Sequence, residues 1–306
     1  MKLVRFLRPG SDQAEVGMAA GNTIRPLAAM APPGGCCDVR AAQAAMQARG
    51  AGQATGEEQL ALRDVTVLAP VAPRSFRDFY AFEQHVVAAR RNRGLEMVAE
   101  WYDAPAFYFS NPAGLIGPGE SVVWPEETQA LDFELELAAV IGVECRDLSA
   151  SAADEVIAGF TVLNDWSARD IQKHEMKVGL GPAKGKDFCT SLGPWLVTPD
   201  ELAPFTHRHA TRGCTYSMRM TAAVNGKQIS AGNSGEMRWT FAELIERASS
   251  CATLQVGDVI GSGTVGTGCI TEFPTGTWPW LQQGDVVTLE VEGIGRLENR
   301  LARSPR

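Results

Sequence analysis

The sequence predicts a mixed, β-rich α+β fold with helices at its periphery. Short apolar stretches separated by glycines fill the last third of the chain, and Asn225-Gly226 between two of them indicates a hairpin turn. The 31 glycines and 17 prolines, with an aromatic content of only 8%, favour a turn-rich sheet protein over a helical bundle.

Apolar periodicity and turn residues locate the individual elements. The chain is expected to form strands at 2–8, 107–116, 121–124, 131–142, 159–164, 218–224, 259–265 and 286–293. Helices are expected at 38–50, 76–93 and 152–157. Two prolines in segment 68–73 indicate a linker, so we expect a small β-containing N-terminal domain at 1–70 and a larger domain at 71–306.

The composition argues against several classes of function. A formal net charge of −8 argues against nucleic acid binding, since the phosphate backbone needs a basic face. No stretch approaches the ~18 consecutive apolar residues of a membrane span, and neither a secretory signal nor a glycine-rich nucleotide loop is expected. The seven cysteines form no CxxC pair, which predicts free thiols in a reducing compartment and a cytoplasmic location.

The stretch 131–140, LDFELELAAV, alternates acidic and apolar residues. On a strand, Glu134 and Glu136 would project from the same face roughly 6.6–7 Å apart, together with Asp132. Two interpretations are open. The strand could present a solvated acidic face, or its carboxylates could converge on a hard cation such as Mg²⁺, Mn²⁺ or Ca²⁺, which prefers oxygen ligands.

A third carboxylate follows the apolar stretch 160–163. Asp165 stands at the expected strand end, where functional groups are commonly presented, although Asn164 or Asp165 could instead cap the following helix. Arg169 and Gln172 come four and seven positions after Asp165, and a helix beginning here would put all three on one side.

Four runs of sequence closely resemble the fumarylacetoacetate hydrolase family: LDFELELA, LNDWSARDIQ, GPAKGKDF and the closing GDVVTLEVEGIGRLENRL. The resemblance covers the chain from about Arg74 to the C-terminus, and the run NDWSARDIQ is highly specific. The N-terminal unit also resembles the small β domain of the longer members. The resemblance implies a β-sandwich or roll domain of the fumarylacetoacetate hydrolase type, and a homodimer.

The resemblance also implies a metal centre and a base. The family's metal ligands match four carboxylates in this chain, those of Asp78, Glu134, Glu136 and Asp165. Mg²⁺ or Mn²⁺ is the implied cofactor, with Ca²⁺ as a further candidate. His85 stands seven residues after Asp78, as in the fumarylacetoacetases proper, and matches their general base. Glu272 matches the carboxylate that orients this histidine.

Further residues match groups that contact the substrate in the family. The residues that hold the oxyanion correspond to Arg169, Gln172 and Lys186, and substrate-contacting side chains correspond to Tyr80, Tyr108 and Thr264. The smaller acylpyruvase-like members carry a glutamate three residues after the histidine, where this chain has Ala88. The residues that follow His85 do not align clearly with the family, so which of Arg90, Arg91 and Arg93 faces the substrate stays open.

These parts imply a metal-dependent hydrolase that cleaves a carbon–carbon bond in a small diketo acid, fumarylacetoacetate- or acylpyruvate-like, with a water activated by His85. An oxaloacetate-type decarboxylase, or a 2-oxo acid tautomerase or isomerase, could use the same metal site. Segment 86–102, rich in Arg and Glu around Gly94, is expected to form a lid.

Other polar residues are weaker candidates. His207 and His209 are expected to be solvated, and His174 to lie at the surface or behind the site. Cys189 is expected to pack near the site as a small apolar residue. No G-x-S-x-G run signals a serine nucleophile.

Overall fold

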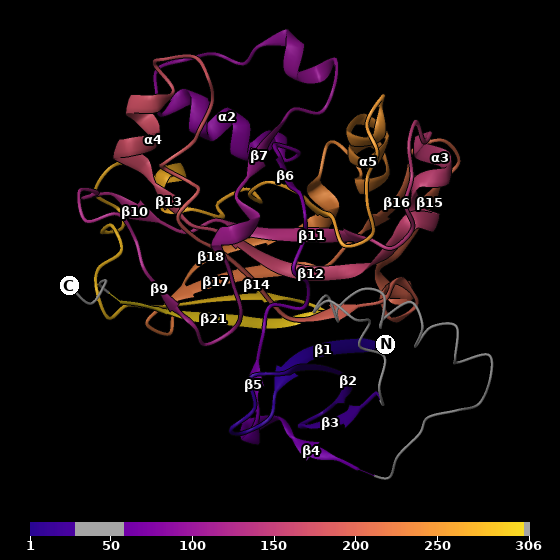
Figure 1. The fold of residues 1–306 in the computed structure, drawn as a ribbon. Helices are drawn as coiled ribbons and strands as arrows, with labels where there is room; N and C mark the ends of the chain where they lie inside the picture. The colour runs from indigo at the N-terminus through magenta and orange to yellow at the C-terminus, as the bar shows by residue number, and fades with distance from the viewer. Residues whose placement is uncertain (28–57, 303–306) are drawn as a thin grey trace.

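The computed structural model describes residues 1–27 and 58–302. The predicted helix at 38–50 and the pair Cys36-Cys37 lie outside the described residues. In the described part, two β-sheets pack face to face, and helices lie on the side away from the N-terminal strands (Figure 1). The predicted β-rich α+β class with peripheral helices is confirmed.

The larger sheet runs in the order β4-β3-β2-β1-β14-β12-β11-β19-β6-β7, with β5 paired to β1 and β8 paired to β14. Its strands after the N-terminal part are β6 (Phe76–Phe79), β7 (Phe107–Ser110), β8 (Leu115–Ile116), β11 (Leu135–Ile141), β12 (Ile157–Asp165), β14 (Thr190–Val197) and β19 (Val259–Gly261). Along this part of the sheet β19 and β6 run parallel, whereas β11 is antiparallel to both of its neighbours, β12 and β19. Strands far apart in the sequence therefore become neighbours around β19.

The second sheet runs in the order β18-β17-β20-β21-β9. Its strands are β9 (Ser121–Val122), β17 (Arg219–Val224), β18 (Lys227–Asn233), β20 (Val286–Val291) and β21 (Gly295–Leu301). Two small ribbons pair β10 (Leu131–Asp132) with β13 (Ser167–Ala168) and β15 (Thr206–His209) with β16 (Gly213–Tyr216). The β17–β18 hairpin turns at Asn225 and Gly226, with φ of +51° and +77°, as predicted.

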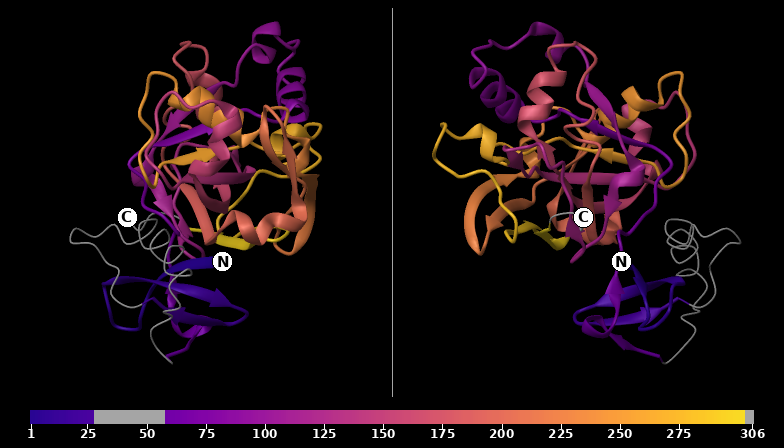
Figure 2. Two further views of the ribbon diagram at one scale, coloured as in Figure 1. Left: turned by 90° about the vertical axis from the view of Figure 1, so that its right-hand side faces the viewer. Right: turned by 60° about the vertical axis from the view of Figure 1, so that its left-hand side comes forward.

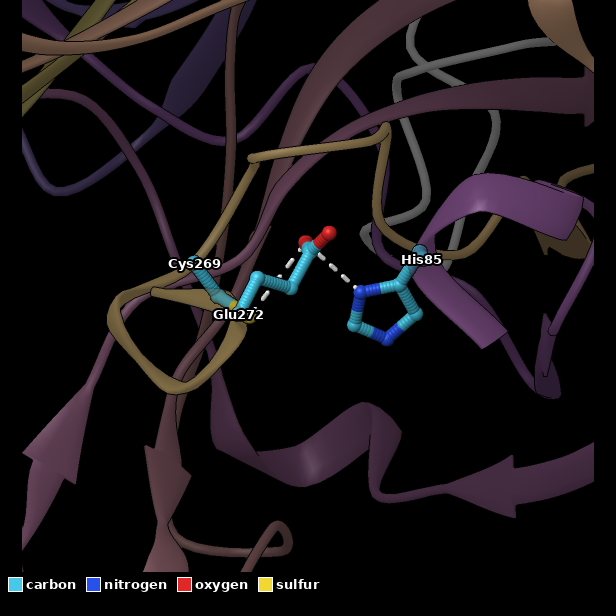
Figure 3. Close-up of side chains that lie close together, drawn as sticks. All are labelled: His85, Cys269 and Glu272. Atoms are coloured by element: carbon cyan, nitrogen blue, oxygen red, sulfur yellow. Dashed lines mark hydrogen bonds and ion pairs between the residues drawn. The ribbon is translucent and has the colours of Figure 1, made fainter. Parts of the chain in front are cut away.

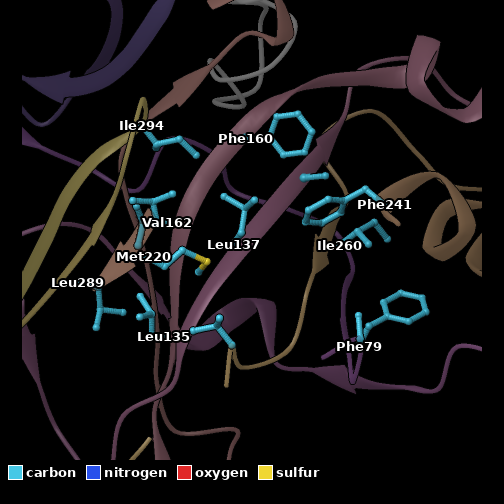
Figure 4. Packing of buried hydrophobic residues seen from close by; sticks show 14 of the residues in the cluster. Phe79, Leu135, Leu137, Phe160, Val162, Met220, Phe241, Ile260, Leu289 and Ile294 are labelled. Carbon is cyan, nitrogen blue, oxygen red and sulfur yellow. The ribbon is translucent and has the colours of Figure 1, made fainter. Parts of the chain in front are cut away.

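The main core lies between the two sheets. Leu135 and Leu137 of β11 pack with Met220 of β17 and Leu289 of β20, and all four are fully buried (Figure 4). Successive side chains of a strand point to opposite faces, so Glu136 faces away from this core. The alternation that predicted the strand therefore also sets where its acidic residue points.

The N-terminal strands extend the larger sheet beyond β14. They are β1 (Lys2–Leu7), β2 (Ala14–Ala20), β3 (Thr23–Pro26), β4 (Leu60–Ala61) and β5 (Thr66–Val67). β1 pairs with the last residues of β14, while Val4, Phe6 and Ile24 form a small apolar cluster of their own. All three views place these strands to one side of the main body (Figures 1 and 2). The domain division at residue 70 stays a prediction.

The α-helices of the described part are α2 (Glu83–Arg91), α3 (Ala150–Ala153), α4 (Arg169–Glu175) and α5 (Phe241–Ser249). Short 3₁₀ turns are η2 (Leu62–Asp64), η3 (Ala99–Tyr102), η4 (Pro112–Gly114), η5 (Asp154–Val156), η6 (Pro199–Phe205), η7 (Ser234–Glu236) and η8 (Ile270–Glu272). α5 begins at a capping box, in which Thr240 and Glu243 each accept a hydrogen bond from the other's backbone N–H. Within the described ranges, no helix combines the length and apolar character that crossing a bilayer requires.

The predicted helix at 76–93 is wrong in its first part. Phe76–Phe79 form β6, which pairs with β19 and β7, and helix α2 begins only at Glu83. All four residues of β6 are buried, and a short strand buried on both faces shows no alternation that would distinguish it from a helical turn. Asp78 therefore lies on a strand and His85 on a helix.

Three of the predicted strands break or leave the sheet at a residue that explains the change. Segment 131–142 breaks at Phe133 and Glu134, where the N–H of Glu134 donates to the side chain of Asn164 at 2.9 Å. Segment 107–116 is interrupted by η4, which begins at a proline. Segment 259–265 leaves the sheet after Gly261, and Gly263 takes a φ of +76°.

Candidate active site

Four carboxylates meet in the larger sheet: Asp78 of β6, Glu134 just before β11, Glu136 of β11 and Asp165 at the end of β12. Strand β19 lies between β6 and β11. Its Gly261 pairs with Asp78 of β6 on one side and with Ala138 of β11 on the other. All four side chains belong to residues that are between 0% and 5% exposed. The solvated acidic face that the sequence left open is therefore excluded.

This carboxylate cluster has the geometry and the donor type that a hard cation requires. One oxygen from each of Asp78, Glu134 and Asp165 lies within 4.8 Å of the other two. Oδ1 of Asp78 and Oε2 of Glu136 are buried and have no hydrogen-bond partner among the described residues, which is costly unless a cation compensates them. A Cβ at Gly261 would lie 2.2 Å from Asp78 Oδ1, so the glycine leaves space for that oxygen. Carboxylate oxygens suit Mg²⁺, Mn²⁺ and Ca²⁺.

Two cationic side chains enter the same cluster. Nζ of Lys186 lies 2.5 Å from Oε2 of Glu134 and 2.6 Å from Oδ2 of Asp165. Arg169 donates from Nη2 to Oε1 of Glu134 and from Nε to Oδ2 of Asp132, both at 2.9 Å. Asp132 and the four clustered carboxylates thus outnumber the cations that the described residues bring to them. A divalent cation would reduce that excess of negative charge.

The surroundings shift the pKa values of these carboxyl groups in opposite directions. Burial, followed by the charge of Asp165, raises the pKa of Asp78 well above its usual range. Burial, followed by the charge of Asp78, does the same to the pKa of Glu136. For Glu134 burial acts in the same sense, but the neighbouring ammonium and guanidinium groups outweigh it and lower the pKa. Burial and the neighbouring negative charges thus disfavour ionisation of Asp78 and Glu136, and a bound cation would oppose both effects.

A second group of side chains lies beside the carboxylates. Nδ1 of His85 on α2 lies 2.8 Å from Oε1 of Glu272 on η8 (Figure 3). The other oxygen of Glu272 accepts a hydrogen bond from the N–H of Thr267 at 2.9 Å, and Sγ of Cys269 lies 3.6 Å from Oε1. His85 is close enough to Glu134 to contribute to lowering its pKa. The predicted base and its carboxylate partner are therefore in contact, next to the candidate metal site.

Asp132 ties the two groups together. Its carboxylate accepts hydrogen bonds from the N–H groups of Ile270 at 2.8 Å and Thr271 at 3.1 Å, in the turn that ends at Glu272. It also accepts the hydrogen bond from Arg169. Sequence analysis placed Asp132 only on the acidic face of a strand; in the structure it holds the Glu272 turn and Arg169 in a fixed relation.

Two of the predicted substrate-contacting residues touch the carboxylate cluster. The hydroxyl of Tyr108 donates to Oδ2 of Asp165 at 2.5 Å. The hydroxyl of Thr264 donates to Oε1 of Glu136 at 3.2 Å. Both hydroxyls therefore lie where a molecule bound at the cluster would meet them.

The remaining predicted site residues lie against the base and the guanidinium group. The ring of Tyr80 packs edge-on against the ring of His85, with centroids 5.3 Å apart. Oε1 of Gln172 accepts a hydrogen bond from Arg169 at 3.1 Å. Every predicted site residue thus lies in one of the two groups or in contact with it, and the roles assigned to them stay predictions.

The segment 86–102 is only partly suited to the predicted lid. Its first residue, Val86, is buried, whereas residues 91–96 are exposed. Arg90 donates to a backbone carbonyl within the segment at 2.5 Å. Burial raises the pKa of Tyr80 to about 12, and the charge of Arg93 opposes this rise. Among the three arginines left open by the sequence, Arg93 is the one whose charge acts on this residue of the site.

The weaker candidates lie as expected. His207 and His209 are exposed on β15, and His174 is exposed on α4. Cys189 is 2% exposed and belongs to the main core. None of these side chains enters the two groups described above.

Two residues of the site carried no signal that sequence analysis used. Gly261 matters through the side chain it lacks, and its register opposite Asp78 depends on the pairing of distant strands. Cys269 precedes Glu272 by three residues, and the η8 turn brings the thiol back to the carboxylate. The spacing of these two residues on a turn could have suggested the contact.

Comparison with known proteins places these features in a family. Residues 74–302 match the family described as fumarylacetoacetate (FAA) hydrolase C-terminal. An uncharacterized protein of Pyrococcus abyssi is 34% identical over 233 residues, which cover 74% of this chain and 94% of that protein. The human protein named oxaloacetate tautomerase FAHD2A, mitochondrial, is 34% identical over 200 residues, covering 64% of this chain and 59% of that protein.

A solved structure extends the similarity to the N-terminal part. The fumarylacetoacetate hydrolase of psychrophilic Exiguobacterium antarcticum has a TM-score of 0.75 at 26% identity, with 99% of this chain and 100% of that chain covered. The fold type that the sequence resemblance implied is thereby confirmed.

Proposed function

Because the chain belongs to the fumarylacetoacetate hydrolase family of enzymes, we propose that it is a metal-dependent hydrolase that cleaves a carbon–carbon bond in a small diketo acid. The substrate class is fumarylacetoacetate- or acylpyruvate-like. The observation that carries the proposal is the His85–Glu272 pair standing beside a separate carboxylate cluster. This division suits hydrolysis, which needs both a polarised carbonyl and an activated water.

The cation would be Mg²⁺ or Mn²⁺, with Ca²⁺ sharing the same ligand preference. The residues that would hold it are Asp78, Glu134, Glu136 and Asp165. The unpartnered oxygens of Asp78 and Glu136 support this assignment, as does the close fit of Gly261 against Asp78. When bound, the cation supplies Lewis-acid polarisation of the substrate's carbonyl oxygens.

His85 would act as the general base. We assign the neutral tautomer with its proton on Nδ1, because Glu272 accepts a hydrogen bond there, and this leaves Nε2 as the acceptor. A water at Nε2 would lose its proton to that nitrogen as its oxygen attacks the substrate carbonyl. The carboxylate of Glu272 would stabilise the imidazolium ion that forms.

Arg169, Lys186 and Gln172 would stabilise the oxyanion formed by this attack. Burial alone would lower the pKa values of Arg169 and Lys186, but the adjacent carboxylates outweigh burial and raise both, which keeps both groups charged. A well-placed donor of this kind commonly contributes ~3–4 kcal/mol to the barrier. As the carbon–carbon bond breaks, its electron pair passes to the departing carbon, which takes the proton back from His85.

Three hydroxyl groups would contact the substrate, those of Tyr80, Tyr108 and Thr264. The hydrogen bonds of Tyr108 to Asp165 and of Thr264 to Glu136 support this placement. A diketo acid held at the cluster would exchange one or both of these bonds for bonds to its own oxygens.

A second candidate activity is tautomerisation of a 2-oxo acid. It is favoured by the 34% identity to a human protein named oxaloacetate tautomerase. His85 would then move a proton between carbon and oxygen of the substrate, and no water would attack. An oxaloacetate-type decarboxylase is a third use of the same parts, since it needs the cation and the orienting side chains alone.

A substrate panel tests the proposal. The purified protein is incubated with acylpyruvates, fumarylacetoacetate and oxaloacetate, in Mg²⁺, in Mn²⁺ and after chelation. We expect two carboxylic acid products from a diketo acid, and loss of activity on chelation. Loss of the enol absorbance of oxaloacetate without cleavage would identify the protein as a tautomerase instead of a hydrolase. Release of CO₂ would identify it as a decarboxylase.

We also propose that the chain forms a homodimer, as the sequence resemblance implies. The apolar side chains of Val178 and Leu180 are 77% and 92% exposed, and a partner subunit could cover them. Sedimentation at micromolar concentration tests this, and a monomer would contradict it.

A further inference from the structure

The group His85–Cys269–Glu272 contains a thiol that the proposed hydrolysis does not use. We propose that these three side chains form a second metal site, for a thiophilic divalent cation such as Zn²⁺, whose occupation inhibits the enzyme by withdrawing its base. The site itself stands on geometry and ligand chemistry. Its effect on turnover rests on the proposed function.

The donor atoms of the three side chains converge. One ligand atom from each residue lies within 4.8 Å of the other two. Tetrahedral Zn²⁺, with bonds of about 2.0 Å to N and O and about 2.3 Å to S, separates N from O by about 3.3 Å and S from O by about 3.5 Å. The structure has 2.8 Å from His85 Nδ1 to Glu272 Oε1 and 3.6 Å from Cys269 Sγ to Glu272 Oε1. Of these two pairs, the first has to open by about half an ångström and the second already fits.

The surroundings hold the three ligands in place without a metal. Cys269 and Glu272 lie three residues apart around one turn, and Asp132 fixes that turn through two backbone N–H groups. The second oxygen of Glu272 is held by the N–H of Thr267. Partners of this kind orient metal ligands and strengthen metal binding. A fourth position around the metal would be left for water.

The two metal sites differ in the cations they prefer. The carboxylate cluster offers oxygen atoms alone, which suits Mg²⁺ and Mn²⁺. The second group offers one nitrogen, one sulfur and one oxygen, a mixture that Zn²⁺ favours and Mg²⁺ does not. An excess of Mg²⁺ would therefore occupy the first site and leave the second open to a thiophilic cation.

Occupation of the second site would remove the base in two ways. Sγ of Cys269 binds as a thiolate and releases its proton to solvent. Nδ1 of His85 binds through its lone pair, so the ring carries its proton on Nε2. That nitrogen then cannot accept a proton from water, and Glu272 is no longer free to stabilise an imidazolium ion.

Cobalt spectroscopy tests the site directly. The full-length protein carries Cys36→Ser, Cys37→Ser and Cys251→Ser, since Cys251 is exposed and the other two form an adjacent pair. In excess Mg²⁺ it is titrated with Co²⁺, which replaces Zn²⁺ in such sites and gives a near-ultraviolet thiolate charge-transfer band. We expect this band, and we expect stoichiometric Zn²⁺ to abolish it. Its absence would overturn the proposal.

Three variants of this protein locate the bound metal. Cys269→Ser should remove the band and weaken Zn²⁺ binding at least ~100-fold, because loss of an outer partner alone costs ~10–100-fold. Cys189→Ser, which alters another buried thiol, should leave the band unchanged. His85→Ala provides a second arm and should weaken Co²⁺ binding at least ~10-fold. A band that survives in Cys269→Ser would place the metal elsewhere and overturn the proposal.

Inhibition tests the consequence. The Zn²⁺ concentration that halves the rate in excess Mg²⁺ should rise at least ~100-fold in Cys269→Ser, relative to that variant's own zinc-free rate. Equal sensitivity of the two proteins would contradict the inhibitory role. If the protein catalyses none of the reactions of the panel, the absorption titration still decides whether the site exists.

Discussion

His85 and Glu272 are 187 positions apart in the chain, and their side chains meet at 2.8 Å. The contact joins the first turn of α2 to the end of η8, and neither residue has a second charged partner at hydrogen-bond distance among the described residues. A carboxylate that holds one nitrogen of an imidazole leaves the other nitrogen free to act as a base.

We expect His85→Ala and Glu272→Gln each to retain the metal and to lose hydrolysis by ~10²–10⁴-fold, the range typical of general base catalysis. The double variant should be little worse than either single variant, because residues that act as one unit are not additive. The rates are measured as kcat/KM and the metal content by elemental analysis. His174→Ala, at an exposed histidine, is the control and should match the wild type.

Two outcomes would change this assignment. Independent, multiplicative losses would show that the two residues do not act as a unit. A His85→Ala protein that still decarboxylates oxaloacetate would favour the decarboxylase, because that reaction needs no activated water.

We expect Glu136→Gln to abolish the binding of Mg²⁺ or Mn²⁺, and the activity with it, while the fold survives. Burial and the charge of Asp78 raise the pKa of Glu136, so replacing its carboxylate by a neutral amide relieves like-charge repulsion in the metal-free protein. Calorimetric titration with Mn²⁺ measures the binding, and the melting temperature without metal measures the fold. Glu144→Gln, at an exposed glutamate, is the matched control. Wild-type metal affinity in Glu136→Gln would exclude Glu136 as a ligand.

Sequence patterns predicted the fold class, and the family resemblance identified the candidate site residues. Neither could predict the distances and contacts between those residues. The alternation around Glu136 predicted a strand correctly, since one face had to be apolar. The strand of Asp78 was missed because it has four residues, FRDF, whose apolar residues stand three apart, as they also would on a helical turn. β11 and β12 are equally buried, but with seven and nine residues they are long enough for an apolar stretch or an alternation to indicate a strand.

Contacts between residues far apart in the sequence could not be predicted from local sequence patterns either. Asp132 contacts Thr271 across 139 positions, and this bond depends on how β10 and η8 meet in the folded chain. The sequence left open which of Arg90, Arg91 and Arg93 faces the substrate, because a segment that is largely exposed has no packing pattern to align. Tertiary contacts decide both the Asp132–Thr271 bond and the placement of the arginines, and the periodicity of a sequence does not report such contacts.

We expect the loop before Lys186 to loosen at acid pH. The carboxylate of Glu175 accepts hydrogen bonds from the N–H groups of residues 183–185, at 3.0, 2.7 and 3.1 Å. Burial opposes ionisation, but these three bonds outweigh it and lower the pKa of Glu175 below its usual value of 4.5. A carboxyl group with a lowered folded-state pKa stabilises the fold above its unfolded-state pKa, and this contribution is lost as the pH falls through the folded-state value.

Hydrogen exchange measures this effect. The protection factors of the amides at 183–185 should fall between neutral pH and about pH 3, as Glu175 takes up its proton. Glu175→Gln should lose that protection already at neutral pH and lower the activity roughly tenfold, because Lys186 follows the loop directly. Glu155→Gln, at an exposed glutamate, should change neither. Unchanged protection in Glu175→Gln would mean that the loop is held by other contacts.

We expect Arg93 to recognise the distal carboxylate of a dicarboxylic substrate. Its charge acts on Tyr80, which packs on the ring of His85. Nε of Arg93 donates to the backbone carbonyl of Ala89 at 2.9 Å, and Nε of Arg90 donates to that of Glu96 at 2.5 Å, so the charge on Tyr80 is what distinguishes Arg93. Arg93→Gln should therefore raise KM for fumarylacetoacetate by about 10–100-fold, the value of one charge-assisted hydrogen bond, with little change in kcat. Steady-state kinetics of the variant measure both constants.

A control variant and a second substrate distinguish two roles of Arg93, namely binding of the distal carboxylate and structural support of segment 86–102. Arg91→Gln alters an exposed arginine at the end of α2, two positions before Arg93, and should leave KM unchanged. An acylpyruvate with an alkyl tail has no distal carboxylate, so Arg93→Gln should leave its KM unchanged as well. A structural role would raise KM for both substrates alike, because a displaced segment affects every substrate that it covers. An equal rise would therefore remove Arg93 from substrate recognition, whereas a rise confined to the dicarboxylic substrate would identify the contact.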